Sequence, residues 1–168
     1  MRLLTSAIAT LAVLWGISSA ADEASTKQVV FVCEHGNVKS FMAASYFNQL
    51  AAQSRLPWRA VARGSAPDSL TVPKPIAEAL RAEGIDASAF RPAKIDAADV
   101  ADAARIVTIG TDLPAGVRAD EQLLERWNDI PPTSVSYAGA RDALKSHIAE
   151  LLEQLSRHSA GGQPDRRN

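Results

Sequence analysis

Residues 29–32 are four apolar, mostly β-branched residues that lead directly into Cys33, the only cysteine of the chain. A short apolar run of this kind is typical of a buried strand. Gly36 and Asn37 then predict a tight turn, and Ser40 is a candidate cap for the helix that follows. The order strand, thiol, loop and helix constrains the fold more than any other stretch of the sequence.

A loop of this shape can point several backbone N–H groups at one spot, where the N-terminus of the next helix adds partial positive charge. An oxyanion bound at that spot would lie directly against the sulfur of Cys33. Lys39, six positions after Cys33, could add a full positive charge. The sequence alone also permits a plain interpretation, in which Cys33 is an inert buried residue and Lys39 a solvated one.

Strand and helix patterns alternate along the rest of the chain, which predicts βαβ units and a largely parallel sheet covered on both faces. Ligands bind such sheets at the carboxyl ends of the strands, so the loops after Arg63 and Gly110 are expected beside Cys33. The stretch from Leu123 to Trp127 is compatible with either a helical or an extended turn. The expected further strands cover residues 58–63 and 105–110, and the expected helices cover about 40–54, 73–84, 96–104 and 140–155.

The two ends of the chain do not have the composition of the central part. Residues 1–21 combine a basic start, an apolar run and small residues before Asp22, as a secretory signal does. The apolar run is shorter than the ~20 residues that a membrane span needs, so a membrane anchor is the less favoured interpretation. We therefore expect a secreted, periplasmic protein with a linker at 22–27, one domain at 28–158 and a disordered tail at 159–168.

Charge and cysteine content exclude several classes of function. The chain has 18 basic and 19 acidic residues, and its basic residues are scattered, so it lacks the basic patch of a nucleic-acid-binding protein. A single cysteine cannot form an internal disulfide. None of the three histidines has a metal-ligand spacing to Cys33, and we expect neither a metal nor a cofactor.

Two aspartates are candidates for a general acid. Asp129 lies in a proline-rich loop that could hold a carboxyl group over a site without belonging to the sheet. Asp112 lies in the loop after the strand at 105–110 and is its competitor. His35 could bind an anion or pair with the thiol, and is otherwise a residue that shapes the loop.

Several segments together resemble a known family. The run from Val30 to Cys33, followed by Ser40 and the Met42-Ala43-Ala44 stretch, is similar to a strand that ends in a Cys-x5-Arg-Ser loop and a helix. Further matching segments lie at 62–66, 72–86, 127–131 and 140–142. Together they resemble the low-molecular-weight protein tyrosine phosphatase superfamily, which also contains thiol-dependent arsenate reductases.

The resemblance implies an α/β, three-layer fold in which a four-stranded parallel sheet is flanked by helices on both faces. It also implies that Cys33 attacks a phosphoryl group and that Asp129 protonates the leaving group. Lys39 stands where the family has arginine, and Ile130 separates Asp129 from its proline. Because lysine cannot grip two oxygens as a planar guanidinium does, we expect weakened catalysis. The oxyanion would be held with Lys39 by Glu34, His35, Gly36, Asn37, Val38 and Ser40.

Two alternatives remain open at the level of sequence. An arsenate reductase of this family would need an external thiol reductant as its partner, because the chain has no second cysteine to resolve an adduct on Cys33. A non-catalytic oxyanion-binding domain is the other alternative. Neither requires nucleic acid, or a membrane once the signal is cleaved.

Overall fold

The computed structural model describes residues 27–161. The predicted signal at 1–21, almost all of the predicted linker and the end of the predicted tail lie outside the described residues. None of the helices within 27–161 is long and apolar enough to cross a membrane.

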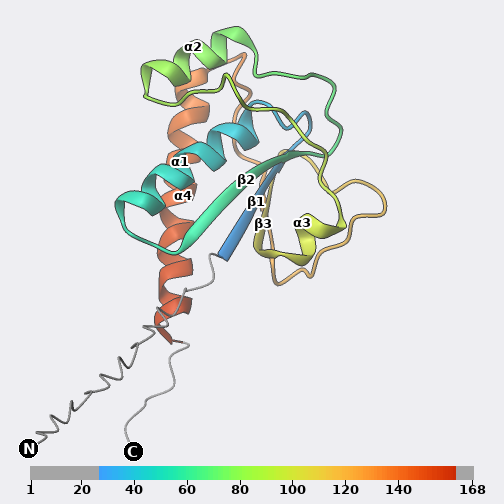
Figure 1. The fold of residues 1–168 in the computed structure, drawn as a ribbon, viewed down its shortest axis with the longest axis vertical. Coiled ribbons are helices and arrows are strands. Elements are labelled where there is room, and N and C mark those ends of the chain that lie inside the picture. The colour runs from blue at the N-terminus through green and yellow to red at the C-terminus, as the bar shows by residue number, and fades with distance from the viewer. Residues whose placement is uncertain (1–26, 162–168) are drawn as a thin grey trace, which may run out of the picture.

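Four parallel strands form one sheet, shown in Figure 1. Their order across the sheet is β2-β1-β3-β4, so the strand that carries Cys33 lies inside the sheet, between two neighbours. The predicted α/β class with a four-stranded parallel sheet is confirmed. The strands are β1 (Lys27–Cys33), β2 (Trp58–Gly64), β3 (Ala103–Ile109) and β4 (Leu124–Trp127).

The apolar run of β1 is fully buried because both faces of the sheet are covered, which is why it shows no alternation. On one face Phe31 packs against Phe47 of α1 and Trp127 of β4, with ring centroids 5.8 and 5.5 Å apart. On the other face Val30 and Ile106 belong to a smaller apolar cluster. The side chain of Cys33 lies on the Phe31 face, in the larger core.

Helices cover the two faces unequally. The long helices α1 (Lys39–Gln53) and α4 (Tyr137–Gly161) pack on the larger core and lie against each other (Figure 1). The short helix α3 (Ala97–Ala101) and the loop before β4 cover the smaller cluster. Helix α2 (Lys74–Ala82) begins with proline in its first turn and is followed by Gly84 at a φ of +79°, as its pattern predicts.

Helix α4 begins earlier and ends later than its apolar periodicity predicts. Ser136 accepts a hydrogen bond from the backbone N–H of Gly139 at 2.9 Å, which satisfies a donor of the first turn and fixes the start at Tyr137. At the other end, residues 159–161, which the sequence placed in the tail, belong to the helix.

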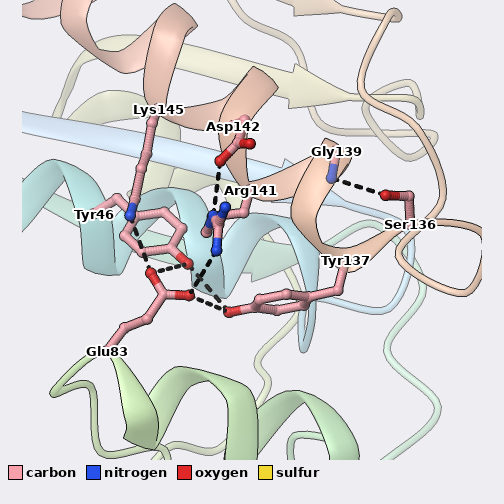
Figure 2. A network of polar contacts seen from close by, with 8 residues as sticks. All are labelled: Tyr46, Glu83, Ser136, Tyr137, Gly139, Arg141, Asp142 and Lys145. Atoms are coloured by element: carbon pink, nitrogen blue, oxygen red, sulfur yellow. Dashed lines mark hydrogen bonds and ion pairs between the residues drawn. The ribbon is translucent and has the colours of Figure 1, made fainter.

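One polar cluster ties α2 to the two long helices (Figure 2). Glu83, just after α2, accepts hydrogen bonds from Tyr137 at 3.0 Å and Lys145 at 3.0 Å, both on α4. The hydroxyl of Tyr46 on α1 donates to the same carboxylate at 3.3 Å. Burial acts to raise the pKa of Glu83, but the hydrogen bonds from Lys145 and Tyr137 outweigh it and hold that pKa below its ordinary value. Three elements therefore depend on one ionised carboxylate.

Glu83→Gln is expected to lower the free energy of unfolding at pH 7 by about 1–3 kcal/mol, since it weakens charge-assisted hydrogen bonds in a partly buried place. The folded-state pKa of Glu83 lies below its unfolded value of 4.5, so the stabilisation is present above pH 4.5 and is lost as the pH falls through the folded-state pKa. Denaturant titrations at pH 7 and pH 3 measure this. The exposed Glu78→Gln on α2 is the matched control, with an expected change below about 0.5 kcal/mol. An equal loss for Glu83→Gln at both pH values would contradict the role of its charge.

Candidate active site

The sulfur of Cys33 lies at the start of α1, as the sequence predicts. Its side chain is buried, and the backbone N–H of Ser40 donates a hydrogen bond to Sγ at 3.4 Å. The hydroxyl of Ser40 lies 3.1 Å from the same sulfur. Ser40 is not a helix cap, because α1 already begins at Lys39 and the preceding residue, Val38, makes no side-chain capping bond. The backbone N–H and the hydroxyl of Ser40 thus both contact the sulfur of Cys33.

The loop between Cys33 and Lys39 is pressed against the end of β2. Gly36 adopts a φ of +73°, and a Cβ at this position would come within 2.6 Å of the backbone nitrogen of Gly64. A Cβ on Gly64 would likewise lie 3.0 Å from the nitrogen of Gly36. Only glycine gives the left-handed conformation without strain and permits this approach. The two glycines therefore set the path of the loop.

Asn37 fastens the same loop from its other side. Its amide nitrogen donates to the hydroxyl of Ser69 at 2.7 Å and to the carbonyl of Thr71 at 3.3 Å, both in the segment between β2 and α2. Backbone N–H groups of that segment also donate to the carbonyls of Cys33 and Glu34. The loop is thus held in place by backbone and side-chain hydrogen bonds.

A cavity of about 290 Å³ opens above the sulfur. Six of the predicted site residues line this cavity. Gly36 packs against β2 and Ser40 contacts the sulfur. Five further residues complete its wall: two at the end of β3 and three from the loop before α4. The lining residues are Cys33, Glu34, His35, Asn37, Val38, Lys39, Ile109, Gly110, Pro132, Thr133 and Ser134.

Lys39 supplies positive charge to this cavity. A Cβ on Gly110, at the end of β3, would lie 2.9 Å from its Nζ atom, so the absence of a side chain at Gly110 leaves room for the ammonium group. Lys39 is half-buried, and among residues 27–161 it has neither an ion-pair partner nor a side-chain hydrogen bond. Its charge is thus uncompensated, in the same cavity as Cys33.

The two candidate acids lie elsewhere. Both carboxylate oxygens of Asp129 contact Nε2 of His147 on α4, at 2.8 and 3.0 Å, and that imidazole stacks on Trp127. This hydrogen bond lowers the pKa of Asp129, so the carboxyl group is ionised at neutral pH. Asp112 lines a different cavity, together with Thr108 and Arg126. The role of Asp129 as a general acid stays a prediction, and its carboxylate is not among the groups that line the Cys33 cavity.

His35, which lines the Cys33 cavity, lies between two carboxylates. Nδ1 of His35 lies 3.1 Å from a carboxylate oxygen of Asp68, and its Nε2 lies 3.8 Å from Glu34. All three side chains are roughly half exposed or more. The loop after Arg63 was expected beside Cys33, but Asp68 within it was not predicted as a partner of His35, because the two lie far apart along the chain.

The residues on the far wall of the cavity were also not predicted from the sequence. Pro132 is the last residue of the predicted Asp129 loop, and Thr133 and Ser134 follow it. The correct loop was therefore singled out, but these three residues were not predicted to line the site. Gly110 was marked only as the end of a strand at the same edge of the sheet. Among residues 27–161 there is no cluster of side chains that could hold a metal ion.

Comparison with known proteins identifies the family. Residues 28–124 match the model of the family described as low molecular weight phosphotyrosine protein phosphatase. The chain belongs to this family. Low molecular weight phosphotyrosine phosphatases and their arsenate reductase relatives are cysteine-dependent enzymes, and Cys33 is the one cysteine here. A comparison with curated protein sequences finds no significant match.

Solved structures have the same fold. YfkJ from Bacillus subtilis is 21% identical, with a TM-score of 0.69 over 80% of this chain and 97% of its own. A low molecular weight protein tyrosine phosphatase from T. tengcongensis is 23% identical, with a TM-score of 0.67 over 76% and 99%. A thioredoxin-dependent arsenate reductase from Corynebacterium glutamicum is 20% identical, with a TM-score of 0.63 over 79% of this chain and 64% of its own. The phosphatase-like fold predicted from the sequence is confirmed.

Proposed function

We propose that this protein hydrolyses phosphate monoesters of the phosphotyrosine type through a cysteinyl-phosphate intermediate on Cys33. The observation that carries the proposal is an uncompensated lysine charge in the same cavity as a buried thiol, with a prefolded loop between them. A dianionic phosphoryl group fits this arrangement, because loop amides and the Lys39 ammonium can hold its oxygens. We further propose that the protein is exported, as the pattern of residues 1–21 predicts.

In the proposed reaction the Cys33 thiolate attacks phosphorus, the S–P bond forms and the bond to the leaving oxygen breaks. Water then attacks the phosphocysteine, which releases inorganic phosphate and regenerates the thiolate. Two donors from Ser40 lie at the sulfur in both steps. Lys39 contributes one point charge where an arginine would hold two oxygens, so we expect slow turnover.

Arsenate reduction with an external thiol is the second candidate. The observation that favours it is the lining of the cavity, in which residues 27–161 place no Phe, Tyr or Trp side chain to stack on a phenyl ring. Arsenate needs no such contact. Because Cys33 is the only cysteine, electrons would have to come from a separate thiol that attacks the Cys33–arsenate adduct.

A product assay distinguishes these functions. The purified chain is incubated with an aryl phosphate and, separately, with arsenate, each across a panel of thiol donors, and phosphate and arsenite are measured. We expect phosphate release that does not depend on which thiol is present, and no arsenite. Arsenite release that varies with the donor, without phosphate release, would support the reductase. Calorimetric binding of phosphate without turnover of either substrate would instead make this an oxyanion-binding domain.

A further inference from the structure

We propose that a second cavity, on the face of the sheet opposite Cys33, binds a free α-amino acid whose apolar side chain ends in a hydroxyl group, as that of tyrosine does. The cavity has a volume of about 340 Å³, within the range of pockets that bind small molecules. It shares no lining residue with the cavity above Cys33. Binding there does not depend on the proposed phosphatase function.

The loop between β3 and β4 supplies the apolar wall of this cavity, which we call the β3–β4 cavity. Leu113, Val117 and Ala119 come from that loop, and Leu124 begins β4. All four pack against the smaller apolar cluster, whereas Cys33 belongs to the larger core on the other face of the sheet. None of the four is fully buried, so each retains apolar surface for contact with a ligand.

The sheet contributes a buried hydroxyl group to the same cavity. Thr108 of β3 lines the cavity and is only 1% exposed, yet its Oγ1 atom has no hydrogen-bond partner within the described part of the chain. A buried hydroxyl without a partner costs free energy, and most buried polar groups in proteins are paired. A ligand hydroxyl that reaches the inner end of the cavity would supply the partner.

Four charged side chains also line the β3–β4 cavity, and two of them neutralise each other. Arg126 donates two hydrogen bonds to the carboxylate of Glu121, at 2.9 and 3.0 Å. Asp112 and Arg118 are exposed, and neither side chain has a hydrogen bond or an ion pair to any other residue in 27–161. One carboxylate and one guanidinium are therefore left to bind a ligand at the outer end of the cavity.

One free charge of each sign fits a zwitterion. The Asp112 carboxylate can accept hydrogen bonds from an ammonium group, and the Arg118 guanidinium can bind a carboxylate through two parallel hydrogen bonds. A plain amine or a plain carboxylate would leave one of the two charges without a partner. With the charged groups at the outer end, the apolar part of the side chain lies along Leu113 and Leu124 and its hydroxyl reaches Thr108. Tyrosine carries these groups in this order.

Calorimetric titration of the full chain with four probes tests the proposal: tyrosine, phenylalanine, tyramine and hydroxyphenylpropionate. Tyrosine is expected to bind about 3- to 10-fold more tightly than phenylalanine, because only tyrosine can bond to the Thr108 hydroxyl. Tyramine lacks the carboxylate and hydroxyphenylpropionate lacks the ammonium group, so each is expected to bind about tenfold more weakly than tyrosine. No binding of tyrosine, or equal affinities for all four probes, would overturn the proposal.

Thr108→Val removes the hydroxyl with little change in shape. We expect this variant to bind tyrosine no more tightly than phenylalanine. Without ligand its melting temperature should be equal to or higher than that of wild type, because a methyl group replaces an unpaired buried hydroxyl. A lower melting temperature would show that the protein itself uses this hydroxyl, and would contradict its assignment to a ligand.

The two charges are tested separately. Arg118→Met should weaken tyrosine binding about tenfold and leave tyramine binding unchanged, and Asp112→Asn should weaken tyrosine but not hydroxyphenylpropionate. The control is Arg157→Met, because Arg157 is 68% exposed on α4 and lies outside the cavity lining. Equal losses for tyrosine and tyramine in Arg118→Met would overturn the zwitterion site. Hydrolysis of an aryl phosphate should be unchanged in Arg118→Met and Thr108→Val, so failure of this site would leave the proposed function standing.

Discussion

Cys33→Ser is expected to lower hydrolysis of an aryl phosphate at least ~10⁴-fold, to the uncatalysed background. A serine hydroxyl placed at the end of β1 remains protonated at neutral pH and is a far weaker nucleophile than a thiolate, so no covalent intermediate forms. The side chain changes by one atom, and the hydrogen-bond partners at Ser40 remain in place. Steady-state kinetics on purified protein measures the loss.

Binding should survive this substitution. The loop amides and Lys39 are unaltered, so the affinity for inorganic phosphate measured by calorimetry should stay within a few-fold of wild type. Ser40→Ala is a useful companion variant, because it removes the hydroxyl 3.1 Å from the sulfur and retains the N–H contact and the nucleophile. Equal turnover by wild type and Cys33→Ser would show that any measured hydrolysis does not use the thiol.

Lys39→Met is expected to lower kcat/KM for the same substrate by about 10²–10³-fold. Methionine keeps most of the length and the apolar character of the lysine stem but removes the charge that lines the cavity. The loss of one such electrostatic contact to a transition state has this size. Phosphate affinity should fall as well, because that charge has no other partner among the described residues. Lys39→Arg should raise kcat/KM by about tenfold, since a guanidinium binds two oxygens at once.

Lys74→Met is the matched control for both changes. Lys74 begins α2 and is 87% exposed, with one long contact to Glu78, so its loss should alter neither kcat/KM nor the melting temperature by a measurable amount. If Lys39→Met kept full activity, the anion would be held by backbone amides alone. If Lys39→Arg lost activity, the space beside Gly110 would be too small for the planar group.

The parts of the fold that are local in sequence could be predicted from it. The strand, loop and first helix around Cys33 follow from an apolar run, Gly36 and a helical period, and the structure contains all three. The sequence pattern did not decide between a helical turn and a strand at β4, because four residues at the edge of a sheet carry little periodicity. Its conformation is decided by pairing with β3, which the sequence does not display.

Asp129, the candidate acid, shows why the site could be predicted only in part from the sequence. Asp129 was chosen because it lies in a proline-rich loop, but the direction of its side chain depends on His147, which α4 brings to it. Buried Ile130 next to it anchors the loop to the core, and the chain reaches the cavity only from Pro132 onward. The partner of His35 was invisible for the same reason, since tertiary packing joins it to Asp68.

The place of β1 inside the sheet has a consequence for the order in which the protein is assembled. Cys33 is synthesised near the start of the domain, yet both neighbours of its strand come later, and the residues that close its cavity come later still, just before α4. Contacts between distant segments form slowly. The thiol is therefore among the first groups of the domain to be synthesised and among the last to be surrounded by its complete cavity. A chain that stops before β3 would contain Cys33 but lack the residues that close the cavity around it.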